Sequence, residues 1–322
     1  MTRHQGSVLI LVTWTVASLS LLAAVLGVRS LFALSFSQRM ERQLQSRAIA
    51  LAGIELALTE LDRDSTPSED GLGETWMDNP VVFQSFQVGR GEVSLSYGDR
   101  YGFTDEERKL PLNKAPPAAL HNLFIQVPGV TVEEVNVIVD SILDWRDADK
   151  EKQPEGAENF YYLGQDPAYE CKDAPFENVE ELLFVQGVTP EILDWVSPHL
   201  TVYGSGKVNL NTADRETLKA LGLSQEGVNG IVFYRAGEDN TEGTVDDRML
   251  SAVSAATTEL AAFCPVEDLN RLAQLDAQQL LAVGSKAFDL RVTAWVEGDA
   301  ASEARVQAVM DRTGRILAWR EL

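Results

Sequence analysis

The sequence predicts an α+β fold, in which a long N-terminal helix packs on an antiparallel sheet that carries a large, mostly α-helical insertion. Three observations support this prediction. Helical periodicity runs without a proline from about residue 8 to residue 63. Strand-like alternation occurs near residues 82–97 and again after residue 284, and the segment between them has the spacing of short paired helices. Strands that flank a helical segment are expected to complete one sheet.

The first element is an apolar run in which residues 8–28 are 21 residues without a charge. At about 1.5 Å rise per residue, this length just crosses a hydrocarbon core of roughly 30 Å. The run is too long for a secretory signal and no small-x-small cleavage site follows it, so we expect a retained membrane anchor. Arg3 lies on the short N-terminal side. By the positive-inside tendency, this places the N-terminus in the cytoplasm and the chain after about residue 30 outside.

The helix is expected to continue beyond the anchor as an amphipathic helix. Its apolar positions recur at three- and four-residue steps, at Leu44, Ala48, Leu51, Ile54 (or Glu55), Leu58 and Leu61. After a loop at 65–79 rich in Ser, Gly, Asp and Pro, alternation at 82–88 and 92–97 predicts a β-hairpin. Further strands are expected at 288–296, 304–309 and 315–319, with a turn at Gly298-Asp299 between the first two.

Three segments of the insertion share one pattern, namely 112–145, 177–196 and 208–235. Each predicts a short amphipathic helix, a turn containing glycine, and a second helix with Thr131, Thr189 or Ser224 as its N-cap. This is the sequence form of a helix-hairpin-helix. We therefore divide the chain into a short N-terminal segment (1–6), the long helix (7–64), the first part of the sheet domain (65–109), the α-helical insertion (110–284) and the strands that complete the sheet (285–322).

The chain of 322 residues is strongly acidic, with 27 Lys and Arg against 49 Asp and Glu and a net charge of −22. Helix-hairpin-helix units are known for binding nucleic acid, but here glutamates stand beside the hairpins and would repel a phosphate backbone. We expect the hairpins to be packing units, and no nucleic acid as a partner. A membrane-anchored DNA-binding receptor is the alternative function. No catalytic motif is present, so we expect that the protein is not an enzyme. An anchored hydrolase remains a further alternative only because carboxylates are plentiful.

The stretch richest in chemistry is Asp144-Trp145-Arg146-Asp147-Ala148-Asp149 and the loop after it, which contains Glu155 and Glu158. Its carboxylates, with carbonyls and water, supply the hard oxygen ligands that Ca²⁺ prefers. The alternative is a solvated acidic loop, and residues 237–247 form a weaker second candidate. Cys171 and Cys264 match no metal or redox motif. In an extracytoplasmic domain a disulfide between them is expected, the alternative being two buried free thiols.

The N-terminal features together resemble those of pilin-like proteins: a short basic leader ending at Gly6, an apolar helix that becomes amphipathic, and then a sheet. The resemblance implies that a prepilin peptidase cleaves between Gly6 and Ser7. Most such proteins carry Glu at the fifth position of the mature chain, where this chain has Leu11. An intramembrane carboxylate there is costly, and is tolerated because it pairs with the N-terminal amine of a neighbouring subunit. Leu11 therefore implies a subunit that forms no such ion pair with a neighbouring subunit above it.

The insertion, the NLNT-like segments at 112–115 and 209–213, and the DWRDAD…GAENFYYL stretch resemble the K-type minor pseudopilin family of the type II secretion system. The resemblance covers nearly the whole chain. It implies a non-enzymatic minor pseudopilin at the tip of the periplasmic pseudopilus, which takes part in pseudopilus assembly and protein secretion with the other minor pseudopilins. It also implies a single pass through the inner membrane and a periplasmic C-terminal domain. Ca²⁺ in the insertion is implied too, and is carried here onto Asp147, Asp149, Glu155 and Glu158.

Overall fold

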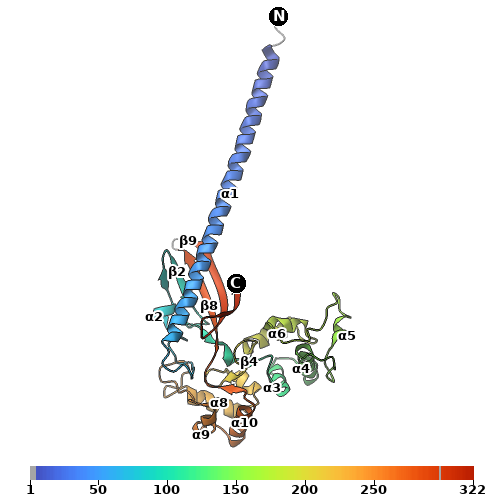
Figure 1. The fold of residues 1–322 in the computed structure, drawn as a ribbon, viewed down its shortest axis with the longest axis vertical. Coiled ribbons are helices and arrows are strands. Elements are labelled where there is room, and N and C mark those ends of the chain that lie inside the picture. Colours follow the sequence, from blue (N-terminus) through green and yellow to red (C-terminus); the bar gives the residue numbers. More distant parts are fainter. Residues whose placement is uncertain (1–4, 297–298) are drawn as a thin grey trace.

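The computed structural model of the chain describes residues 5–296 and 299–322. Its longest element is α1 (Gln5–Asp62), a single helix of 58 residues that projects away from the rest of the molecule (Figure 1). The predicted continuous helix is therefore confirmed. Every side chain between positions 8 and 45 is exposed, so the first part of α1 makes no packing contact within this chain that buries it.

Only the last part of α1 packs on the sheet, and it does so through a stripe that differs from the predicted one. The buried residues are Ser46, Ile49, Ala50, Gly53, Ile54, Ala57, Glu60 and Leu61. Leu44 and Leu51, which the periodicity placed on the buried face, are 56% and 46% exposed. The sheet approaches the side of the helix with the smaller residues. A Cβ atom at Gly53 would lie 2.7 Å from Val93 Cγ2, so glycine permits this close approach.

The sheet has six strands in the described residues, and its pairings are antiparallel, as predicted. The strands are β1 (Phe86–Val88), β2 (Gly91–Leu95), β3 (Thr104–Asp105), β8 (Ala287–Val296), β9 (Asp299–Asp311) and β10 (Ile316–Glu321). Their order is β1-β2-β8-β9-β10, with β3 paired to β8. Because β2 before the insertion pairs with β8 after it, the chain leaves the sheet and returns to it at neighbouring strands (Figure 1).

The face of the sheet that meets α1 is apolar. On β8 the buried Leu290 and Val292 alternate with the exposed Arg291 and the half-buried Thr293, which is the pattern of a sheet covered on one face. An aromatic group closes the end of this core near the C-terminus of α1, with ring centroids 5.2–5.9 Å apart. Its members are Trp76, Phe83, Phe103 and Phe288.

Two parts of the predicted sheet need correction or qualification. Val82 and Phe83, predicted in a strand, belong to the helical turn α2 (Pro80–Phe83). Pro80 favours this turn, because the first position of a helix has no use for the N–H that proline lacks. The predicted turn at Gly298-Asp299 includes Gly298, which lies outside the described residues, while Asp299 begins β9.

The insertion consists mostly of short helices. The 3₁₀ helix η1 (Glu106–Arg108) lies just before it. The helices of the insertion, where η marks a 3₁₀ helix, are α3 (Pro117–Phe124), α4 (Val132–Arg146), α5 (Asn159–Tyr162), η2 (Val179–Phe184), α6 (Pro190–Val196), η3 (Ser197–His199), α7 (Arg215–Ala220), α8 (Gln225–Arg235), η4 (Val253–Ala255), α9 (Ala256–Glu259) and α10 (Val266–Ala277). The three predicted hairpins are α3–α4, η2–α6 and α7–α8. Thr131, Thr189 and Ser224 cap their second helices, as predicted.

The insertion repeats one structural pattern twice. In the first half, the short strand β4 (Leu110–Pro111) pairs in parallel with β5 (Leu200–Thr201), and in the second half β6 (Val208–Asn209) pairs in the same way with β7 (Leu281–Ala282). A Leu-Asn pair follows each first strand. Asn113 exchanges hydrogen bonds with the backbone of Phe176, and Asn211 does so with the backbone of Leu250. The NLNT-like segments therefore mark the start of two equivalent units.

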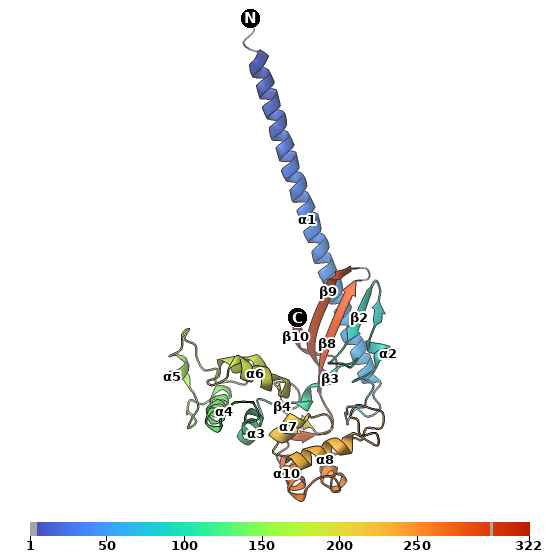
Figure 2. The ribbon, with the colours of Figure 1, turned by 180° about the vertical axis from the view of Figure 1, so that it is seen from behind.

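The buried side chains form two clusters. One lies between α1 and the sheet, and the other extends through the insertion from Leu110 to Leu281. In both ribbon views the insertion lies at the end of the molecule remote from the N-terminus, and α5 marks its outermost lateral part (Figures 1 and 2). The result is a thin helical stalk that bears a wide head.

Candidate functional site

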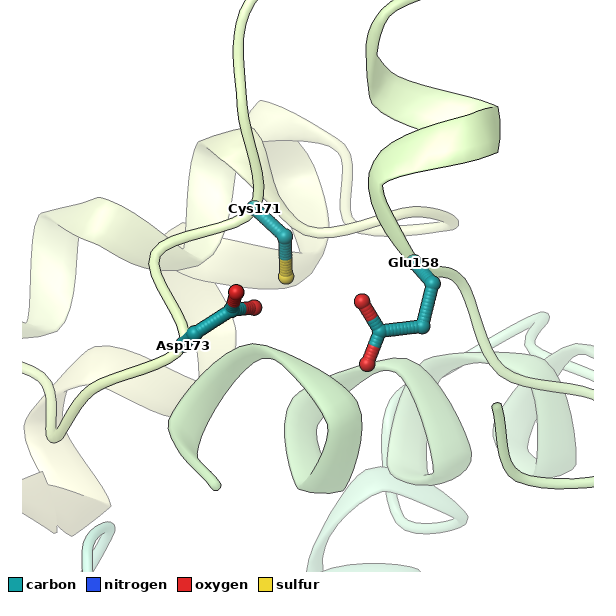
Figure 3. A group of neighbouring side chains, drawn as sticks. All are labelled: Glu158, Cys171 and Asp173. Atoms are coloured by element: carbon teal, nitrogen blue, oxygen red, sulfur yellow. The ribbon is translucent and has the colours of Figure 1, made fainter. Parts of the chain in front are cut away.

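In the first half of the insertion, four carboxylates from three chain segments lie near enough to interact electrostatically, and this group is called the acidic pocket. Asp144 lies in the last turn of α4 and Asp147 is its C-cap residue. Glu158 is the N-cap of α5, and Asp173 lies in the loop that leads to η2. Figure 3 shows the side chains of Glu158 and Asp173 pointing toward the sulfur of Cys171.

Each of these carboxylates has a buried oxygen without a hydrogen-bond partner among the described residues. These atoms are Asp144 Oδ2, Asp147 Oδ1, Glu158 Oε1 and Asp173 Oδ1. Asp144 is completely buried, and its other oxygen accepts a hydrogen bond from the Gln153 N–H at 2.9 Å. A buried acceptor without a donor is costly, so these four oxygens fit a bound cation.

Gly156 passes close to one of these oxygens. A Cβ atom at Gly156 would overlap Asp144 Oδ2, so glycine lets the loop pass over this carboxylate. The nearby basic side chains are used elsewhere. Arg146 donates to the carbonyls of Leu112 and Ala115, and Lys172 binds Glu181 at 2.8 Å.

The pKa values of the carboxylates also reflect their burial and their closeness to one another. Burial, and then the charge of the neighbouring carboxylates, raises the pKa of Asp144 and of Glu158 above the usual range. The pKa of Asp147 is raised by burial and by Asp149, and Arg146 lowers it only as the smallest of the causes. A divalent cation with oxygen ligands is the partner that such a group of carboxylates suits.

The residues carried over from the resemblance lie in different places. Asp147 and Glu158 belong to the pocket, whereas Asp149 and Glu155 are exposed on the loop between them. Asp149 Oδ1 accepts a hydrogen bond from the Glu151 N–H at 2.8 Å. Asp144 and Asp173 were not among those residues. Asp144 could have been predicted as a member of the pocket, because its three-residue spacing from Asp147 places both side chains on one helix face. Asp173 is remote in sequence, and no local pattern connects it with the pocket.

The second acidic loop, residues 237–247, has a different character. Asp246 Oδ2 accepts hydrogen bonds from the backbone N–H groups of Glu238 and Asp239, and Asp247 accepts from Gly243 and Thr244. These carboxylates are therefore used to fold their own loop. In the described part of this loop, no buried carboxylate oxygen lacks a partner.

The predicted disulfide between Cys171 and Cys264 is not formed, and both residues are buried free thiols. Cys171 follows α5 and Cys264 precedes α10, and these helices lie at opposite ends of the insertion (Figure 2). Cys264 Sγ donates to the Gly227 carbonyl at 3.5 Å. Burial raises the pKa of Cys171 to about 12 and that of Cys264 to about 11. The folding of the insertion, rather than the spacing in sequence, keeps them apart.

The other candidate functional region is α1. Among the described residues, this is the one helix long and apolar enough to cross a membrane. Gly6 and Ser7 lie in its first turns, and the Leu11 side chain is exposed on its surface. An apolar helix that continues as one packed on an antiparallel sheet defines the class of pilin-like proteins.

Comparisons with known proteins find relatives within this class. Residues 103–205 match the family model described as type II secretion system (T2SS), protein K. Type II secretion system protein K of Klebsiella pneumoniae is 24% identical over 331 residues, which covers 97% of this chain and 94% of that protein. The protein of the same name from Pseudomonas aeruginosa is 29% identical over 235 residues, 69% of each chain.

A solved structure shares the fold. The crystal structure of the GspK-GspI-GspJ complex from the enterotoxigenic Escherichia coli type 2 secretion system contains a chain that matches with a TM-score of 0.65 at 18% identity, covering 91% of this chain and 99% of that one. The chain described here is thus similar to type II secretion system protein K over nearly its whole length, and its residues 103–205 match the model of that family. These matches support a role as a minor pseudopilin in type II secretion, and they give no support to the alternative of an anchored DNA receptor.

Proposed function

We propose that this minor pseudopilin stands at the tip of the periplasmic pseudopilus, with its anchor helix in the inner membrane before assembly and the remainder of the chain in the periplasm. The position of the insertion carries this proposal. It lies at the end remote from the anchor and extends sideways beyond the sheet (Figures 1 and 2). A subunit stacked above it would collide with the insertion, so the shape suits the end of a filament better than its shaft.

Leu11 adds independent support for an end position. A carboxylate at this depth of the membrane would need a partner such as the N-terminal amine of an adjacent subunit. Leu11 has no such need, because its side chain is stable in lipid or against other apolar helices. We propose that a prepilin peptidase first cleaves between Gly6 and Ser7, which makes this side chain the fifth of the mature protein.

The partners that we propose are the other minor pseudopilins. The related E. coli chain was crystallised in a complex with GspI and GspJ. In the present chain, the exposed apolar surface of α1 extends from Val8 to Phe36, beyond the length that lipid alone covers. Helices of partner subunits would cover this surface after the chain leaves the bilayer.

We further propose that the acidic pocket holds Ca²⁺, with Asp144, Asp147, Glu158 and Asp173 as its ligands. Their partnerless buried oxygens and the room left by Gly156 support this assignment. The ion would supply the positive charge that four crowded carboxylates need, and would thereby tie α4, α5 and the loop before η2 together. This role is structural, because the cation stabilises the head of the pseudopilin.

The position at the tip is tested by labelling assembled pseudopili. A biotin acceptor peptide placed in the exposed loop 165–168 is visualised with streptavidin-gold by electron microscopy. Gold at one end of each filament is the expected result, and the same peptide on the major pseudopilin should label the whole length. Gold distributed along the shaft would rule out a tip position while leaving membership of the family untouched.

A further inference from the structure

The acidic pocket contains a sulfur atom as well as oxygens. Cys171 Sγ, a carboxylate oxygen of Glu158 and one of Asp173 all lie within 4.8 Å of one another. Figure 3 shows the three side chains converging from two chain segments. Cys171 Sγ makes a long hydrogen bond, 3.8 Å, to the Asp144 carbonyl, and its thiol also interacts with the Asp173 carboxylate.

A thiol in this position changes which cations the pocket can bind. Ca²⁺ takes oxygen ligands and gains nothing from sulfur, whereas Zn²⁺ and Cd²⁺ bind a cysteine thiolate together with carboxylates. Cys264 provides the contrast. It lies against the Gly227 carbonyl, and it belongs to none of the potential metal-holding groups in the described residues.

We infer that the pocket also binds a thiophilic divalent cation of the zinc class, with Cys171, Glu158 and Asp173 as ligands. This inference rests on the cation site proposed above and adds a second, competing metal to it. Water, or one of the nearby carboxylates Asp144 and Asp147, would supply the fourth ligand that Zn²⁺ requires. When the metal–sulfur bond forms, the S–H bond breaks and its proton passes to solvent.

The ligands of the two cations overlap. Cys171, Asp144 and Glu158 are buried, and Asp147 and Asp173 are half-buried. Because the same carboxylates would bind either cation, one pocket cannot hold Ca²⁺ and Zn²⁺ together on these ligands. Zinc is therefore expected to displace calcium, with Cys171 as the residue that decides between them.

The test uses the full chain in detergent, stripped of metal by a chelator under reducing conditions. Cd²⁺ is titrated as a spectroscopic substitute for Zn²⁺, and the thiolate-to-metal charge-transfer absorption is recorded in the ultraviolet. We expect this band in the unchanged chain and in Cys264→Ser, and its absence in Cys171→Ser. We also expect the affinity for Zn²⁺ to fall at least about tenfold in Cys171→Ser. The shift of the melting temperature by Ca²⁺ should be retained in that variant.

The outcomes separate this inference from the proposed calcium site. A band that persists in Cys171→Ser, or no band in the unchanged chain, overturns the inference even when Ca²⁺ still stabilises the protein. No stabilisation by either metal overturns both proposals. Should Cys171→Ser fail to fold, Asp173→Asn provides the second variant. It keeps the thiol but loses a charged ligand, and is expected to weaken the cadmium band.

Discussion

Arg146 and Arg235 donate to matching carbonyl groups in the two halves of the insertion, and Arg235 in addition pairs with Glu242. Each is the last residue of the second helix of a hairpin, and each donates to the carbonyl groups of a leucine and an alanine in the preceding Leu-Asn segment. For Arg146 the acceptors are Leu112 and Ala115, and for Arg235 they are Leu210 and Ala213. A guanidinium with two forked donors is suited to join two carbonyls that a lysine could not bridge. The halves are therefore equivalent in their internal hydrogen bonds as well as in their helices.

Replacing Arg146 with glutamine should lower the free energy of unfolding by about 2–3 kcal/mol, because two carbonyl acceptors lose their charged donor. Urea unfolding of the chain in detergent, followed by tryptophan fluorescence, measures this change. The matched control is Arg47→Gln, which breaks an ion pair with Glu321 in which both side chains are about half exposed. Its loss should stay below about 1 kcal/mol. Equal losses in the two variants would contradict the structural role of Arg146.

Substituting Gly53 with valine should force α1 away from the sheet. A Cβ atom there meets Val93 and Val292, and the cost of such overpacking is about 1–3 kcal/mol. Thermal unfolding followed by circular dichroism provides the measurement. Leu51→Val, two residues earlier on the exposed face, is the control and should change stability by about 0.5 kcal/mol or less. A neutral Gly53→Val would show that the helix does not pack as described.

Removal of Ca²⁺ should lower the melting temperature, and excess Ca²⁺ should restore it. At an ion concentration of about 100 times Kd, the gain in stability is about 2.7 kcal/mol. Differential scanning calorimetry with and without chelator measures the shift. Asp147→Ala should abolish the response, whereas Asp149→Ala should preserve it, because Asp149 lies exposed outside the pocket. Identical melting with chelator and with Ca²⁺ would leave only an acidic loop without a bound ion.

Stability should fall as the pH rises from about 5 to about 8. Burial, together with the charges of Asp70 and Asp64, raises the pKa of Glu74 to about 8. In this window the folded chain keeps a proton that the unfolded chain has released, so the unfolding free energy decreases with increasing pH. Glu74→Gln should flatten the dependence measured by urea unfolding at saturating Ca²⁺. Glu55→Gln, on the exposed face of α1, should leave it unchanged, and an unaltered slope in Glu74→Gln would refute this origin.

Replacing Gly6 with valine should leave the leader attached, because the peptidase site implied by the family resemblance needs a small residue before Ser7. Mass spectrometry of the purified chain detects the retained segment, and secretion of a substrate enzyme should be lost. Gln5→Ala should be processed normally. A correctly processed Gly6→Val chain would remove the basis for assigning cleavage between Gly6 and Ser7.

Several features could be predicted from sequence because their causes are local. The continuous helix needs only an unbroken run of helix-forming residues. The N-caps at Thr131, Thr189 and Ser224 depend on a hydroxyl placed just before a helix, within three residues of its acceptor N–H. The antiparallel strands of the C-terminal part depend on alternation with a period of two.

The face of α1 that packs on the sheet could not be predicted from sequence. Both Leu51 and Ala50 fit an apolar stripe, and periodicity alone favours the larger side chains. In the structure, the side of α1 that bears Ala50 and Gly53 packs on the sheet. Small residues there let the helix approach Val93 and Val292 of the sheet closely. That choice depends on the shape of the partner surface, which no local pattern contains.

By itself, the sequence determined the long apolar N-terminal helix, the order of helix, sheet and insertion, and the presence of an acidic stretch around Asp147. Each of these follows from composition or from periodicity within a short window. Only the tertiary structure decided which carboxylates share a pocket, and that Cys171 lies among them and far from Cys264. The physical reason is that Asp173 and Cys171 reach Asp144 through a turn of the chain whose path is set by packing and by the clamp of Asn113 on Phe176.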